Sequence, residues 1–191
     1  VTAIPDSLTK VFYTKNQRPV RDGGGVRPEF EVKAPELPTM IYYLAADTVL
    51  FDFVTEWAQK HPQIAPIEEF AVSDEDFEAF KTYAKEKQFT YDRQSEKALQ
   101  KLKEIATFEG YLSDDSTTFK ALEARFTPNL EQDFNRFKKE VKKTMATEIV
   151  KRYYYQRGEL QESLKGDAVL EKALQVLADP ELMKKTLSKP E

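Results

Sequence analysis

The sequence contains no cysteine and only one histidine, His61. The absence of cysteine excludes disulfide bridges, thiolate zinc sites and a cysteine nucleophile. A Ser-His-Asp triad or a multi-histidine metal site would have to use that single imidazole. Asp47 and Asp52 interrupt the most apolar stretch, residues 40–54, which is shorter than the roughly 20 residues that a membrane-spanning helix needs. We therefore expect no transmembrane segment.

The chain also lacks an excess of positive charge. Its formal net charge is −4 over 191 residues, and no long basic run occurs. Binding to nucleic acid through phosphate neutralisation is therefore not expected. Hydrophobic residues make up 40% of the sequence and include 13 Phe and 9 Tyr, which is enough for a folded core. Composition predicts a globular domain and indicates no activity.

The first 38 residues differ in composition from the rest of the chain, since they contain half of the ten prolines and half of the six glycines. Residues 8–14 and 26–32 are β-type runs, and the second alternates apolar and charged side chains, as in an extended segment or hairpin. From residue 39 onward, apolar residues recur at spacings of three and four, which is typical of helices. We predict a mainly α fold: an extended or hairpin segment over residues 1–38, followed by a helical domain of five to seven helices over residues 39–191.

The helix boundaries are predicted from capping residues and helix breakers. Ser73 with Asp76 resembles a capping box, Ser95 is expected to cap the following helix, and Gly110 to end it. The expected helices cover residues 40–60, a segment from Ser73, a segment from Ser95 to Gly110, a short segment before Pro128, a long segment that starts at Asn129 or Thr127 and runs through Tyr153, and residues 167–178 before Pro180. Gly158 is expected to kink or end the long helix.

Few side chains form a pattern with catalytic chemistry. Ser7 and Lys10 match a Ser-x-x-Lys motif, but in a β-type run they point to opposite faces. His61 lies at a predicted helix end, where a positive charge interacts favourably with the helix dipole. We prefer this structural role to a role as metal ligand. Residues 23–25 are glycines without the following helix that a phosphate loop needs, so we expect a turn there. We predict no catalytic residue, cofactor site or metal site in this chain.

Tyr153, Tyr154 and Tyr155 are consecutive, with Arg157 two residues further on. Three successive helical residues point in different directions, so at least one tyrosine should face away from the core. Packing in the core is the favoured interpretation, and a binding patch is the alternative. We keep these four residues as the candidate interaction surface.

The N-terminal segment resembles the end of the catalytic domain in carboxyl-terminal processing (tail-specific) serine proteases, in the form found in Bacteroidetes-type members. The resemblance covers Ile4-Pro-Asp-Ser-Leu8, Phe12-Tyr-Thr14 and Arg18-Pro-Val20-Arg-Asp-Gly-Gly-Gly-Val-Arg-Pro28. The structural motif positions are Arg18, Gly23, Gly24, Gly25, Val26 and Pro28. Gln17 stands where the family usually has glycine, and Glu29 where it usually has aspartate. Residues 148–158 also resemble the C-terminal extension of those members.

The resemblance implies a parent enzyme that pairs a serine nucleophile with a lysine general base. Both residues precede the hairpin segment in that family, so residue 1 falls after them and this chain alone should be inactive. The parent would cleave peptide bonds near the C-termini of proteins, usually outside the cytoplasm, in the periplasm or on the cell-envelope side. The implied partners are its own protease domain, protein or peptide substrates, and a second copy of the chain. The helical region would serve docking, dimerisation or substrate guidance.

Two other interpretations stay open on the residues alone. The chain could be a free-standing helical protein-binding module whose hairpin resembles the protease by chance. The tyrosine segment and the lysine stripe at residues 138–143 would then be its binding surface. A small self-contained enzyme that uses His61 or carboxylates has the least support, because nothing in the sequence fixes the geometry of such a site.

Overall fold

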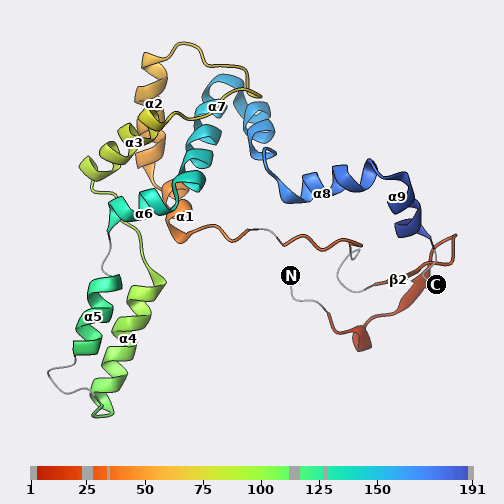
Figure 1. Ribbon diagram of the computed structural model, residues 1–191, viewed down its shortest axis with the longest axis horizontal. Helices are drawn as coiled ribbons and strands as arrows, with labels where there is room; N and C mark the ends of the chain where they lie inside the picture. The colour runs from red at the N-terminus through yellow and green to blue at the C-terminus, as the bar shows by residue number, and fades with distance from the viewer. Residues whose placement is uncertain (1–3, 23–27, 34, 112–116, 127–128, 189–191) are drawn as a thin grey trace. The chain divides into compact units, whose positions relative to one another are not determined.

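The computed structural model describes residues 4–22, 28–33, 35–111, 117–126 and 129–188 (Figure 1). Its elements are η1 (Asp6–Leu8), β1 (Val11–Tyr13), β2 (Pro19–Arg21), α1 (Thr39–Ala46), α2 (Thr48–Lys60), α3 (Asp74–Glu86), α4 (Gln94–Phe108), α5 (Thr117–Phe126), α6 (Leu130–Arg136), α7 (Lys138–Ser163), α8 (Ala168–Leu177) and α9 (Pro180–Leu187). The chain divides into two compact units, residues 36–163 and residues 1–35 with 164–191. The predicted fold class, mainly α after an N-terminal hairpin, is confirmed. The predicted boundary between residues 38 and 39 stays a prediction.

The N-terminal hairpin pairs β1 with β2 in antiparallel register, with Phe12 opposite Val20. In its turn the N–H of Gln17 donates to the carbonyl of Thr14 over 2.9 Å, and Gln17 has a φ of 59°. Gln17 therefore adopts the left-handed backbone that glycine favours, at the position where the resembling family has glycine. The turn geometry is kept although the glycine is absent.

The β-type run over residues 26–32 forms no strand in its described part, residues 28–32. The second strand is β2 instead. Residues 19–21 reach β1 through a short turn, and Pro19 is accommodated at the first position of the strand, where proline is tolerated. Of the two segments that could pair with β1, the one with the shorter connection, residues 19–21, forms the hairpin.

The predicted helix over residues 40–60 is divided by Asp47 into α1 and α2. Asp47 has an extended backbone, with ψ of 153°, and its carboxylate accepts the N–H of Val49 over 3.1 Å. An aspartate in this position caps the start of a helix. Asp47 is therefore the N-cap of a new helix, α2, although the apolar pattern continues on both sides of it.

The predicted long helix from Asn129 is also divided. Asn129 caps α6 by accepting the N–H of Gln132 over 3.0 Å, and Phe137, with φ of −106° and ψ of 25°, separates α6 from α7. α7 then continues past Gly158, but Tyr155 has φ of 55° and ψ of −154°, so the helix bends three residues earlier. This region of φ and ψ is occupied almost only by glycine, and a tyrosine in it is strained.

Two further boundaries also differ from the prediction. Pro180 begins α9 at the first helical position, where its missing N–H costs nothing, instead of only ending the helix before it. Arg93 rather than Ser95 stands at the cap position of α4. The described part of the chain thus holds nine α-helices where we expected five to seven, because two predicted helices are divided and α9 is added.

The core of residues 36–163 is built on buried aromatic rings from α2, α3 and α6. Phe80 lies 5.1 Å from Phe53 and 5.7 Å from Phe134 between ring centroids, and Phe77 lies 6.3 Å from Phe134. The apolar face of α7 closes this core with Val141, Met145 and Ile149, all fully buried. Burial of these side chains supplies most of the hydrophobic stabilisation of the unit.

Ion pairs join the start of α7 to the start of α3. Lys138 and Lys142 place their ammonium groups 2.8 Å and 2.6 Å from one Asp74 oxygen. These hydrogen bonds and charges lower the pKa of Asp74 to about 2. Part of the lysine stripe at residues 138–143 therefore faces α3.

α4 and α5 form a helical hairpin, which we call the α4–α5 arm (residues 94–126; Figure 1). Among the described elements the two helices pack mainly on each other. The base of the arm is fixed by Asp133 of α6, which is buried, pairs with Arg93 and accepts the Tyr91 hydroxyl over 2.9 Å. The Arg93 guanidinium also lies 5.2 Å from the centre of the Tyr91 ring. One polar cluster therefore anchors the arm.

Replacing Gln88 with glycine is expected to raise the free energy of unfolding by about 0.5–1 kcal/mol. Gln88 ends α3 with φ of 54°, and the N–H of Phe89 donates to Ala84 over 2.9 Å, as in a Schellman motif. The equivalent position after α4 is already Gly110, with φ of 79°. Gly110→Ala is the matched opposite change and should lower the free energy of unfolding of the α4–α5 arm by a similar amount. Urea denaturation measures both, and a destabilised Gln88→Gly variant would show that the strain is not relieved.

Candidate functional site

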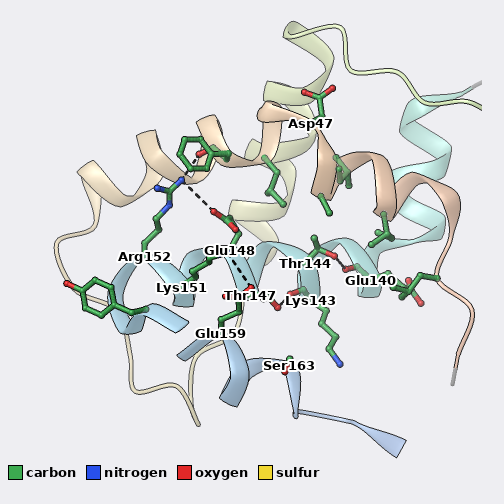
Figure 2. A pocket seen from close by; sticks show the side chains of 17 residues that line it. Asp47, Glu140, Lys143, Thr144, Thr147, Glu148, Lys151, Arg152, Glu159 and Ser163 are labelled. Carbon is green, nitrogen blue, oxygen red and sulfur yellow. Dashed lines mark hydrogen bonds and ion pairs between the residues drawn. The ribbon is translucent and has the colours of Figure 1, made fainter. Parts of the chain in front are cut away.

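A groove of about 860 Å³ lies between α1 and α2 on one side and α7 on the other (Figure 2). Its apolar floor comes from residues before and within α1 and α2: Leu37, Ile41, Leu44, Ala45, Leu50 and Phe51. Its opposite wall is polar and comes from α7: Glu140, Lys143, Thr144, Thr147, Glu148, Lys151, Arg152, Tyr155, Glu159 and Ser163. We call this feature the α7 groove.

Arg152 joins the two sides of the α7 groove. Its guanidinium lies 3.9 Å from the centre of the Phe51 ring, donates to the Thr55 hydroxyl over 2.9 Å, and pairs with Glu148 at 3.6 Å. Contact with the ring covers one apolar face of Phe51, and a cation over an aromatic ring is attracted to it. Arg152 therefore holds α7 against α2 and shapes one end of the groove.

The bend at Tyr155 carries the end of α7 back along the groove. Lys151 and Glu159 are eight residues apart in sequence, yet their charged groups lie 3.3 Å apart. In a straight helix their backbone positions would be about 12 Å apart. The bend therefore brings Glu159 into the wall of the groove beside Lys151 (Figure 2).

The hydroxyl groups of the groove are engaged within their own helix. Thr144 donates to the carbonyl of Glu140 over 2.9 Å, Thr147 to Lys143 over 3.0 Å, and Ser163 to Leu160 over 2.8 Å. No histidine lines the groove. None of these hydroxyls is paired with a general base, which nucleophilic catalysis requires. The arrangement is suited to binding.

The four residues of the candidate interaction surface separate in the structure. Tyr153 packs against the core and donates to the carbonyl of His61, and burial raises the pKa of its phenol. Tyr154 and Arg157 line a small pocket beside Ile67, whereas Tyr155, 77% exposed, lines the α7 groove. The expectation that one tyrosine faces away from the core is confirmed. The joint role of the four residues in binding stays a prediction.

The other sequence candidates lie apart from the groove. His61 ends α2, where Nδ1 lies 2.8 Å from the carbonyl of Trp57 and the two rings stack at 3.9 Å. Ser7 lies in η1, and Lys10 follows it with an exposed side chain. Within the described ranges, no group of three or more acidic, histidine or cysteine side chains is placed to hold a metal. No helix in the part of the chain that the structure describes has the length and apolarity to cross a membrane.

The family-motif residues are only partly described. Arg18 pairs with Glu29 and lies 3.5 Å from the carbonyl of Thr186. A backbone hydrogen bond and then Arg18 lower the pKa of Glu29, so the carboxylate keeps its charge where the family usually has aspartate. Pro28 is exposed. Gly23, Gly24, Gly25 and Val26 lie outside the described residues.

Comparison with known proteins identifies the helical part. The family model described as "Probable PDZ-protease, C-terminal helical domain" matches residues 40–177. The chain belongs to this family. The match covers α1 through α8, so the α7 groove and the α4–α5 arm both lie in the C-terminal helical domain of a probable PDZ-protease. No curated protein and no solved structure matches the chain.

Sequence reasoning did not find the α7 groove. Its two sides come from residues 37–51 and 140–163, which the packing of α1 and α2 against α7 brings together. The available signal was the half-polar face of α7, where Thr144, Thr147 and Lys151 follow each other at spacings of three and four. Such a face is usually solvated, so the pattern alone does not indicate a groove.

Proposed function

We propose that this chain is the non-catalytic C-terminal region of a carboxyl-terminal processing serine protease, and that its α7 groove guides unfolded substrate segments. The observation that carries the proposal is the groove itself, with mainly apolar side chains and Asp47 along one side and charges of both signs along the other. Membership in the PDZ-protease helical-domain family supports a role beside a protease domain. The N-terminal motif, from Ile4 to Pro28, supports the carboxyl-terminal processing type.

The chemistry of the groove suits an extended polypeptide of mixed sequence. Leu44 and Leu50 offer a buried apolar floor, while Phe51 and Leu37 expose apolar surface at its edges. Its volume is within the range of about 300–1,000 Å³ that binding pockets occupy. Charges of both signs on α7 can pair with basic and acidic side chains of a substrate alike. Selection among substrate sequences would therefore be weak. A guide for many substrates needs such tolerance.

Filling the groove should weaken binding of an unfolded protein. Thr147 lines the groove from α7 and bonds only its own helix, so Thr147→Trp places a large ring in the groove without removing a core contact. We expect at least a tenfold weaker affinity for fluorescently labelled, reduced and alkylated lactalbumin, measured by anisotropy. Thr82→Trp on α3 is the matched control, since Thr82 makes the same bond to its own helix outside the groove. Equal binding by both variants would contradict the guiding role.

The protease assignment has its own test. The 191-residue chain should not cleave the same lactalbumin, whereas the parent with its upstream serine and lysine should. We further propose that the parent acts outside the cytoplasm, on the strength of the family resemblance. Cleavage by the chain alone would contradict the non-catalytic assignment, and Ser7, Lys10 and His61 would be the first residues to replace.

A further inference from the structure

α4 carries apolar side chains that the described residues of its hairpin leave exposed. Leu102, Ile105 and Phe108 follow each other at spacings of three and are 52%, 44% and 93% exposed. Tyr111, just after the helix, is 84% exposed. α5 packs on α4 beside Leu99, which is buried. We call the four exposed residues the α4 stripe.

The α4 stripe exposes more apolar area than single, scattered apolar residues do. Sequence periodicity places Leu102 and Ile105 on the same apolar face as Leu99, and α5 covers only part of that face. Phe108 and Tyr111 alone offer roughly 300 Å² per chain, since an aromatic side chain buries 150–250 Å². Two stripes in contact would bury on the order of 1,000 Å² in total, which is at the lower limit of specific interfaces. The area is sufficient for a weak pair of identical chains.

The charges beside the stripe complement a second copy of themselves. Lys101 and Glu104 directly precede Leu102 and Ile105 in the sequence and pair with each other at 3.1 Å. When two identical helices pack antiparallel about a two-fold axis, the same edge of each helix faces the other. A pairing centred between Leu102 and Ile105 would therefore place Lys101 of each chain near Glu104 of its partner. A surface with this pattern attracts its own copy.

We propose that the α4 stripes of two chains pack antiparallel and join the arms into a four-helix arrangement. A helical hairpin with one uncovered apolar face buries that face when a second hairpin packs on it, as in helix bundles. The inference is independent of the proposed guiding function, because the stripe lies on the arm and the α7 groove lies between α1, α2 and α7.

Sedimentation of the 191-residue chain at concentrations from 5 to about 500 µM tests the pairing, with weak association expected from the modest area. We expect a reversible shift from one to two chains within this range. Leu102→Lys and Phe108→Lys should each weaken association at least tenfold, since each buries a charge at the interface. Leu174→Lys on α8 is the control, because it removes an equally exposed leucine elsewhere and should change nothing. A chain that stays single at the highest concentration overturns the proposal.

A charge exchange separates a second copy from any other partner. Lys101→Glu and Glu104→Lys should each weaken association about three- to tenfold, because the two-fold axis doubles every like-charge contact. The double variant restores opposite charges across the axis and should associate like the original chain. Association that is unaffected by all three variants would mean that another surface is used. Variants that no longer associate should still bind lactalbumin normally. A negative result for association therefore does not contradict the guiding function.

Discussion

Replacing Phe134 with alanine is expected to lower the free energy of unfolding by about 4 kcal/mol. Phe134 is fully buried, and its ring meets Phe80 and Phe77 edge to face, at 5.7 Å and 6.3 Å. Alanine removes these ring contacts and leaves a cavity between α3 and α6 that rigid neighbours cannot fill. Urea denaturation followed by near-ultraviolet circular dichroism measures the loss.

Phe108→Ala is the control for this substitution. Phe108 is exposed on the arm, so at low micromolar concentration its loss should change the free energy of unfolding by less than about 0.5 kcal/mol. If the two alanine variants were equally stable, the aromatic cluster would not be the core of the unit.

Replacing Gly158 with alanine is expected to straighten α7. A Cβ atom at residue 158 would lie 2.3 Å from Cβ of Tyr154 and 3.0 Å from Cγ1 of Val150. In a regular helix, Cβ atoms four residues apart are about 5–6 Å apart, so the clash exists only in the bent form. The added methyl group should cost the bent form about 2–3 kcal/mol, and Tyr155 can relieve it by returning to helical φ.

The absence of cysteine makes the change easy to measure. Cysteines introduced at Lys139 and Gln161, both exposed, can be spin-labelled without interference. A straight helix would place these positions about 33 Å apart, and the bent form holds them closer. Gly166→Ala is the control for the added methyl group: its φ of 65° strains alanine locally, but nothing lies within 4 Å of its Cβ position, so the label distance across α7 should not change. An unchanged distance in Gly158→Ala would show that the bend does not depend on Gly158.

Straightening of α7 should also weaken binding in the α7 groove. Tyr155 and Glu159 line it only because the helix turns back, and the ion pair between Lys151 and Glu159 requires the same bend. Gly158→Ala should therefore lose affinity for unfolded lactalbumin together with the short label distance. A variant that changes the distance and still binds normally would place the binding surface on the remaining part of the groove.

Much of the helical pattern could be predicted because local signals determined it. Ser73 caps α3 by accepting the N–H of Asp76 over 3.0 Å, and Gly110 follows α4 in the left-handed conformation, both as the residues predict. The divisions at Asp47 and Phe137 could not be predicted, because apolar spacing continues whether or not one residue leaves the helix. Pro180 is compatible with a helix end and with a helix start, so its residue type does not decide between them.

The candidate site depends on tertiary structure to a greater degree. The sequence predicts that one of three consecutive tyrosines leaves the core, but not that Tyr155 does so through a backbone conformation that disfavours it. Arg152 reaches Phe51 and Thr55 across about a hundred residues of sequence. Contacts at such separations follow from how α2 and α7 pack, which no local pattern specifies.

Few side chains are buried within the α4–α5 arm, and this affects how the protein unfolds. Of the described residues in α4 and α5, Leu99 alone is buried, whereas α2, α3 and α7 share one continuous core. The hydrogen bonds of the arm are therefore protected only by its own marginal stability, and those of the core helices by the stability of the whole unit. The arm can lose its structure and regain it while the aromatic core stays folded. Unfolding of this domain is then not a single cooperative event, and its first step is confined to the arm.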